Sequence, residues 1–123
     1  MTTVESKYRG TKEYSLVYTE LITAAKYKGT VTYQEIAKIV GLPMQGNHMS
    51  KMLGQILGEI SEDEVANRRP MLSAISFGVS GKPGKGFYEL ARKLGCLKEK
   101  DDELDFWKKE CQQVYETWKV ILK

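Results

Sequence analysis

The sequence has few of the residues on which many site chemistries depend. Its 123 residues include two cysteines, one histidine and three prolines. Cys96 and Cys111 have no histidines at metal-ligand spacing, so neither a metal site nor a disulfide scaffold is expected. No apolar run approaches the roughly 18 residues that cross a bilayer, and residues 1–10 lack the apolar core of a signal peptide. We therefore expect a cytoplasmic protein with no membrane partner and no cofactor.

The charge is nearly balanced but unevenly distributed. The formal net charge is +3, and the hydrophobic share of 41% is typical of a folded globular protein. Residues 26–98 contain eleven basic and six acidic side chains, whereas residues 99–123 contain five and seven. A basic middle segment favours a polyanionic partner, because Lys and Arg neutralise phosphates. The length suits one domain, which we expect over 12–123 after a flexible arm over 1–11.

Segment 32–60 has the pattern of a helix-turn-helix. Thr32 and Glu35 form a capping-box pattern, and Gly41 suits the left-handed end of a short helix. Apolar residues at steps of three and four predict a second helix over 47–59. A DNA-binding helix-turn-helix presents the first side chains of its second helix to the major groove. The expected base contacts are Asn47, His48, Ser50, Lys51 and Gln55.

The second half of the chain predicts three further elements. The run 71–77 partly alternates and predicts a strand, after a linker over 61–70. The loop 78–86 contains four glycines and two lysines, and a helix over 87–94 follows it. A long helix over 102–122 ends the chain. With a further helix over 12–28, these elements predict a mainly helical fold with a small β element, namely a winged-helix-like helix-turn-helix domain in which the strand and basic loop occupy 71–86.

The terminal helix has a narrow apolar seam. Its members recur at alternating steps of three and four, the spacing of a coiled-coil face. The seam either folds back over the helix at 12–28 or pairs with a second copy, and we favour a homodimer through residues 104–121. The seam consists of Leu104, Trp107, Cys111, Val114, Trp118 and Ile121.

The glycine-rich loop 78–86 has two functional interpretations. Its amides and the following helix start form an anion site, or the loop is a wing that lies against the DNA backbone. An exposed turn without a function is the alternative. Lys85 is followed by glycine rather than Ser or Thr, so nucleotide hydrolysis is not expected. The expected phosphate contacts are Lys26, Lys28, Arg68, Arg69, Lys82 and Lys85.

The segments on either side of the turn read GTVTYQEIAKIVG at 29–41 and NHMSKMLGQIL at 47–57. Together they resemble the winged-helix DNA-binding domain of alkylguanine-DNA alkyltransferases and alkyltransferase-like proteins. The resemblance implies that Tyr33 assists nucleotide extrusion and that Lys51 enters the base stack. The family's reactive Pro-Cys-His-Arg segment has no counterpart, because residues 67–73 read NRRPMLS. Alkyl transfer to cysteine is therefore not expected, since no thiolate stands beside a histidine base.

These patterns predict a non-catalytic protein that binds nucleic acid, with duplex DNA as the favoured partner. A role in transcription regulation, DNA processing or defence follows from that interpretation. The serines have no histidine partner in a recognisable motif, so no catalytic residue is expected. Three alternatives are open: a winged-helix adaptor that binds proteins, a sensor of modified or damaged bases on the alkyltransferase-like scaffold, and an enzyme subunit that holds a nucleotide at the glycine-rich loop.

Overall fold

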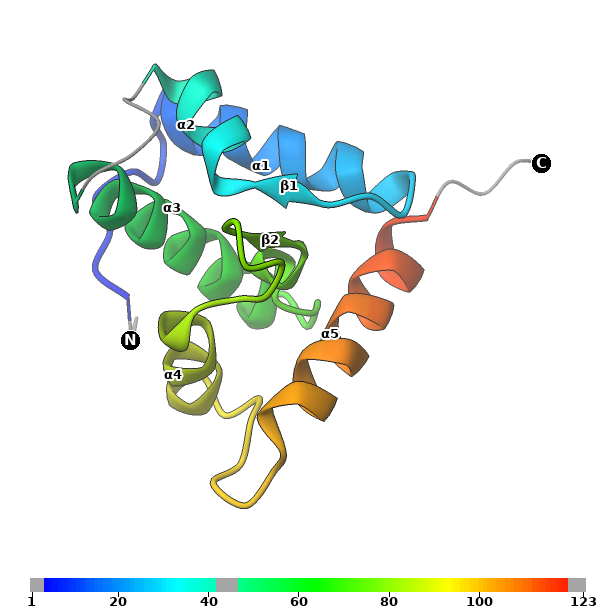
Figure 1. Cartoon of the computed structure of the whole chain (residues 1–123). Coiled ribbons are helices and arrows are strands. Elements are labelled where there is room, and N and C mark those ends of the chain that lie inside the picture. The colour runs from blue at the N-terminus through cyan, green and yellow to red at the C-terminus, as the bar shows by residue number, and fades with distance from the viewer. Residues whose placement is uncertain (1–3, 42–46, 120–123) are drawn as a thin grey trace.

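The computed structural model describes residues 4–41 and 47–119, and of Asn47 only the backbone. Two short strands pair in parallel, with Val31 opposite Ser76 and Thr32 opposite Phe77. The fold is therefore mainly helical with a small β element, as predicted (Figure 1). The elements are α1 (Lys12–Lys26), β1 (Val31–Thr32), α2 (Tyr33–Val40), α3 (Asn47–Ala66), the 3₁₀ helix η1 (Leu72–Ile75), β2 (Ser76–Phe77), α4 (Lys85–Lys93) and α5 (Glu103–Trp118).

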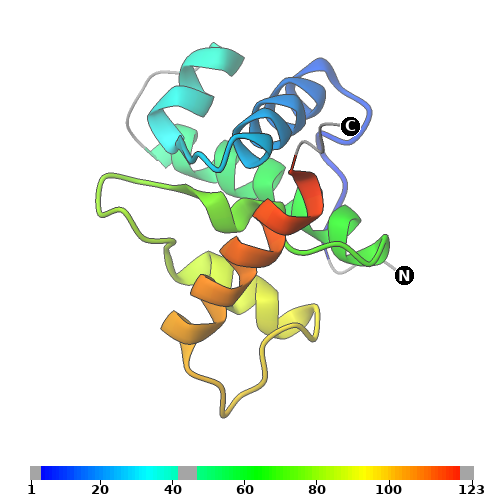
Figure 2. The same cartoon turned by 90° about the vertical axis from the view of Figure 1, so that its right-hand side faces the viewer.

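One hydrophobic core is shared by the helices. α1 and α3 contact each other, and η1 contacts α1, α3 and α5. Leu21, Ile36, Ile56 and Ile75 are fully buried, so four successive elements each contribute a large apolar side chain. Figure 2 shows α5 crossing in front of this layer. Within the described part of the chain, no helix combines the length and apolar character of a membrane span.

The boundaries predicted for α2 are confirmed. The Thr32 hydroxyl accepts a hydrogen bond from the Glu35 backbone N–H at 3.1 Å, and the Glu35 carboxylate accepts one from the Thr32 N–H at 3.2 Å. Gly41 ends the helix in the left-handed conformation, with φ +77°. The turn expected at Leu42 and Pro43 lies outside the described residues.

α3 is longer than predicted, so of the linker expected over 61–70, for which one helical turn from Ser61 was the alternative, only residues 67–70 lie outside a helix. The helix continues to Ala66 because the acidic residues after its predicted end have partners instead of solvent. It closes at Arg68, which has φ +61°, and the Arg69 backbone N–H then bonds the Glu64 carbonyl at 2.9 Å. A non-glycine residue in the left-handed region is uncommon, and the sequence has no glycine here to indicate the stop.

The strand expected over 71–77 is also largely wrong. Residues 72–75 form η1, and only Ser76 and Phe77 are strand. Alternation predicted one exposed face, but both serines of the run are buried. The Ser61 hydroxyl donates a hydrogen bond to the Ser73 hydroxyl at 2.7 Å and accepts one from the Ser73 N–H, so a partner on α3 satisfies the polar groups of Ser73.

Residues 4–11, expected to be flexible, lie along α3 instead. The Val4 backbone N–H donates to the Glu62 carboxylate at 2.9 Å. The Arg9 guanidinium pairs with Glu62 at 2.7 Å and with Asp63 at 3.0 Å. The acidic run that suggested a solvated linker therefore provides the partners of the N-terminal segment.

The described part of the terminal seam folds back over the chain's own core. The Trp107 indole N–H donates to the Ala74 carbonyl at 2.9 Å, and the Tyr115 hydroxyl donates to the Gly29 carbonyl at 2.8 Å. Val114 is fully buried, and α5 contacts both α1 and η1. This is the first of the two arrangements considered for the seam. Pairing with a second copy through residues 104–121 stays a prediction.

Candidate nucleic-acid interface

The two halves of α3 differ in exposure. In its C-terminal half residues 59–62 are all buried, whereas among the described side chains of its N-terminal half Met49, Leu53 and Ile56 are buried and four residues are exposed. Three of the predicted base-contacting residues therefore share one solvent-facing surface with a glycine. The exposed residues of this half are His48, Ser50, Lys51 and Gly54.

A groove of about 330 Å³ lies between this half of α3 and the N-terminal segment. It brings together cationic or titratable side chains that are far apart in the sequence, because Lys7 comes from the segment and Lys51 from α3. The described residues that line it include no carboxylate. We call it the basic groove, and its lining is Lys7, Tyr8, His48, Lys51, Met52 and Gln55.

One buried carboxylate, that of Glu59, holds the N-terminal segment in place. It accepts hydrogen bonds from the backbone N–H groups of Lys7 at 3.1 Å, Tyr8 at 3.0 Å and Arg9 at 2.8 Å, and from the Gln55 amide at 2.9 Å. Burial raises the pKa of Glu59, but these hydrogen bonds outweigh burial and hold its pKa below the usual value. The carboxylate is therefore a charged anchor for three consecutive amides.

Among the described residues, one of the predicted base contacts is already hydrogen-bonded within the chain. Gln55 is engaged within the chain, because its amide donates to the Glu5 carbonyl at 2.6 Å as well as to Glu59. The side chain of Asn47 lies outside the described residues. The structure thus brings His48, Ser50 and Lys51 together, and it adds Lys7 of the N-terminal segment.

A smaller pocket, of about 130 Å³, lies on the adjoining face of α3, between that helix and the start of α4. Tyr33 forms one wall, and its ring lies against Gly78, where a Cβ would be 3.5 Å from the Tyr33 Cδ2 atom. Burial raises the pKa of Tyr33 above its ordinary value. We call this the Tyr33 pocket, and its lining is Tyr33, Gly54, Leu57, Gly58, Ser73, Gly84, Gly86, Phe87 and Leu90.

Gly54 is a residue that the sequence analysis missed. It lies inside α3, where glycine costs about 0.5–1 kcal/mol relative to alanine. A Cβ at this position would have no atom within 4 Å, so no packing contact requires a glycine. The sequence did contain a signal for this position, namely a glycine inside a segment with helical apolar periodicity. An unexplained glycine often marks the close approach of another molecule.

Lys82 and Lys85 are both exposed near the Tyr33 pocket. Gly81 has φ +77° and donates its N–H to the Gly78 carbonyl at 3.1 Å, which makes a tight turn before Lys82. Lys85 is the first residue of α4, so the helix expected over 87–94 begins two residues earlier. Between the two lysines, Gly84 caps α4 without a side-chain hydrogen bond.

Arg68 and Arg69 lie at the other end of α3, which spans 20 residues, roughly 30 Å. Arg69 contacts the buried carboxylate of Glu64 at 2.9 Å, and its guanidinium lies over the Trp118 ring, 5.5 Å from the centroid. Arg68 is exposed. The structure therefore does not bring the two arginines together with Lys51.

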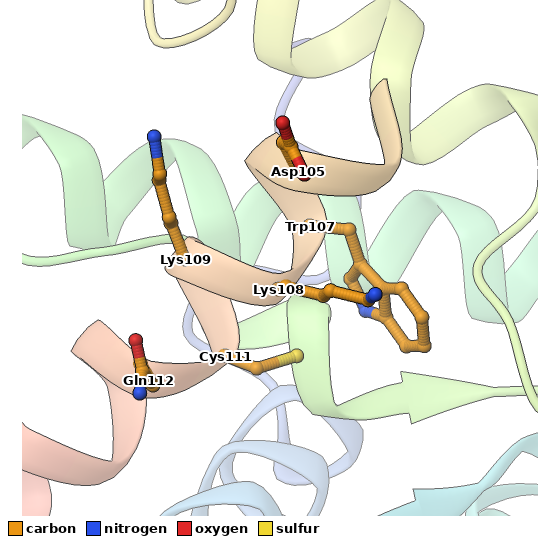
Figure 3. A pocket seen from close by; sticks show the side chains of 6 residues that line it. All are labelled: Asp105, Trp107, Lys108, Lys109, Cys111 and Gln112. Carbon is orange, nitrogen blue, oxygen red and sulfur yellow. The ribbon is translucent and has the colours of Figure 1, made fainter. Parts of the chain in front are cut away.

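A shallow hollow of about 540 Å³ lies on α5, on the side of the molecule away from the start of α3. Figure 3 shows Trp107, Lys108 and Cys111 directed to one side of the helix, whereas Lys109 and Gln112 point the other way. The Cys111 thiol donates to the Ala74 carbonyl at 3.4 Å, and burial with the nearby Glu110 carboxylate raises its pKa to about 11. At neutral pH it is therefore a thiol rather than a nucleophilic thiolate.

Among the described residues, no group of three or more His, Cys, Asp or Glu side chains is placed to hold a metal ion. No family model, no curated protein and no solved structure matches this chain.

Proposed function

We propose that this chain is a non-catalytic protein that binds duplex DNA through the N-terminal half of α3. A short capped helix followed by a helix with a polar, exposed start is the arrangement of DNA-binding helix-turn-helix domains. In this proposal His48, Ser50 and Lys51 face the base edges of the major groove. Lys82 and Lys85 contact phosphates at one flank.

The observation that carries the proposal is the distribution of charge around α3. The carboxylates of its buried half are engaged within the chain, Glu59 by backbone amides and Glu64 by Arg69. The lysines around its exposed half form no ion pair with any residue that the structure describes, and they face solvent. A polyanion that approaches this half meets Lys51 and Lys85 rather than the acidic residues, which favours phosphate binding.

A winged-helix assignment belongs to the same proposal. The loop between β2 and α4 has the position and the lysines expected of a wing. It differs from a wing made by an antiparallel hairpin, because β1 and β2 are parallel and have two residues each. The proposal therefore assigns the contact with the DNA backbone to the loop after β2, which ends at the start of α4.

The decisive experiment is a salt titration of binding to duplex DNA. Lys51→Ala is expected to weaken binding and to make the plot of log K against log salt shallower by about one, because a cation close to the phosphates is lost. The thermal stability of the variant should equal that of the wild type, since Lys51 is exposed. Replacing Lys82 and Lys85 together should reduce the slope by about one to two.

Two controls separate charge from folding in this experiment. Lys109→Ala removes an exposed lysine of α5, which lies away from the start of α3, and should leave the slope unchanged. Leu53→Ala truncates a core residue of the same helix and should cost about 2–5 kcal/mol of stability. Equal losses of stability for Lys51→Ala and Leu53→Ala would contradict the assigned faces, and a wild type without measurable duplex affinity would favour the adaptor alternative.

The Tyr33 pocket favours a second candidate, a sensor of modified bases. The resemblance to alkyltransferase-like proteins implies that Tyr33 assists extrusion of a nucleotide, and the pocket beside Tyr33 adjoins the proposed DNA-binding half of α3. Extruded bases are held in such pockets by stacking and by hydrogen bonds. This candidate predicts tighter binding to a duplex that contains an alkylated guanine than to the same duplex without it.

Gly54→Ala tests this candidate directly. Alanine is expected to stabilise the protein by about 0.5–1 kcal/mol, because the new Cβ meets nothing within 4 Å. The methyl group narrows the Tyr33 pocket, so the preference for the modified duplex should fall. The measurements are urea unfolding and competition between the two duplexes. A stabilised variant that keeps the full preference would argue against the pocket as the base site.

A further inference from the structure

The N-terminal segment brings a cation to the basic groove that no local signal in the sequence connects with α3. Lys7 lies more than forty positions before Lys51, yet both line the same groove. The segment reaches this place because its backbone, rather than its side chains, is bound. Three consecutive N–H groups, those of Lys7, Tyr8 and Arg9, bond the carboxylate of Glu59.

This mode of attachment leaves the Lys7 side chain available. Its backbone N–H is the group that Glu59 binds, whereas the side chain is exposed and lines the groove. Arg9 differs, because its guanidinium is engaged by Glu62 and Asp63. Lys7 is therefore the cation that the segment presents to a ligand.

The charges that face the groove favour an anion. Lys7, His48 and Lys51 line it, and the N-terminal end of a 20-residue helix adds partial positive charge. The carboxylate of Glu59, the nearest acidic residue in sequence on α3, is enclosed by amides, and the exposed side chain of Glu5 is not part of the groove lining. A phosphodiester of DNA therefore meets donors and cations at this groove.

We propose that Lys7 contacts the DNA backbone and that Glu59 is the positioning residue that holds it there. The inference rests on the proposed DNA-binding function and deepens it: the N-terminal segment is a docked part of the interface. The basic groove then binds one phosphate of the duplex beside the base-contacting half of α3. Variants of Lys7 and variants of Glu59 should therefore lose affinity for DNA for the same reason, namely the loss of the backbone contact made by Lys7.

The test measures binding of the full chain to a plain duplex at several salt concentrations. Lys7→Ala should lower affinity about fivefold to tenfold at 0.1 M salt and make the slope shallower by about one, whereas Lys7→Arg should keep both. Glu59→Gln, at a temperature where it is folded, should give the same loss. The double variant should lose no more than either single variant, because residues that act as one unit are not additive.

Hydrogen exchange at the amides of residues 7–9 supplies the structural readout, and Lys109→Ala is the charge control. Faster exchange in Glu59→Gln together with the reduced slope supports the proposal. An unchanged slope in Lys7→Ala, with a reduced slope in Lys51→Ala, overturns it while the proposed function stands. Faster exchange of the amides of residues 7–9 in Glu59→Gln, without a change in the salt slope, also overturns the proposal. No duplex affinity in the wild type overturns both.

Discussion

Replacing Arg69 with alanine is expected to lower the free energy of unfolding by about 3–5 kcal/mol, because it leaves a buried carboxylate without its cation. The Glu64 side chain is fully buried, and two nitrogens of Arg69 contact its two oxygens at 2.9 Å each. The Tyr18 hydroxyl also donates to this carboxylate, but a neutral donor does not replace the charge. The guanidinium additionally covers the Trp118 ring.

Arg68→Ala is the matched control for this prediction. Arg68 is adjacent and exposed, and alanine keeps the Cβ that makes its left-handed backbone unfavourable, so stability should change by less than about 0.5 kcal/mol. Urea unfolding of both variants measures the difference. Similar losses would contradict the assignment of Arg69 to the fold. Duplex binding by the folded variants tests whether the two arginines contact phosphates. A shallower salt dependence of binding in either variant would indicate that the replaced arginine belongs to the interface.

The second large effect concerns Glu59 and its dependence on pH. Glu59→Gln should lower the unfolding free energy at pH 7 by about 3 kcal/mol, because hydrogen bonds to a charged group contribute about 1.5–3 kcal/mol each. An amide also presents donor hydrogens to backbone N–H groups that need an acceptor. The variant loses the anchor of residues 7–9 while the size of the side chain is kept.

This contribution should disappear in acid. The pKa of Glu59 is lower in the folded protein than its ordinary value of 4.5, so the unfolded chain binds the proton more readily. The stabilisation is complete above pH 4.5 and is lost as the pH falls through the folded value. The difference between wild type and Glu59→Gln should therefore shrink from pH 7 to pH 3. A difference in unfolding free energy that stays constant with pH would contradict the charged anchor. Glu89→Gln, at an exposed site, is the control and should have the same unfolding free energy as the wild type at both pH values.

The sequence was sufficient where structure depends on neighbours along the chain. α2 begins at Thr32 and ends at Gly41 because the capping hydroxyl, the carboxylate and the left-handed glycine act within a few residues of each other. The helix predicted over 12–28 also forms, as α1, and its Val17 and Leu21 lie in the core. The exposed start of α3 followed from the same alternation of apolar and polar side chains.

Local patterns failed where a distant partner changed the environment of a residue. The acidic residues after Ile60 suggested a solvated linker, but Arg9 neutralises Glu62 from more than fifty positions away, and the helix continues. The apparent alternation at 71–77 suggested a half-exposed strand, but Ser73 is buried against Ser61. In both cases a polar side chain was buried with a partner, which composition and periodicity do not reveal.

The sequence by itself determined a mainly helical chain with a helix-turn-helix pattern and a basic middle segment. Only the tertiary structure decided which charges are available to a ligand. It assigned Arg69 to a buried ion pair and Gln55 to the chain itself, and it brought Lys7 beside Lys51. The reason is physical: capping and periodicity are set by residues within a turn or two, whereas the burial of Glu59 and Glu64 requires partners that only the folded chain brings together.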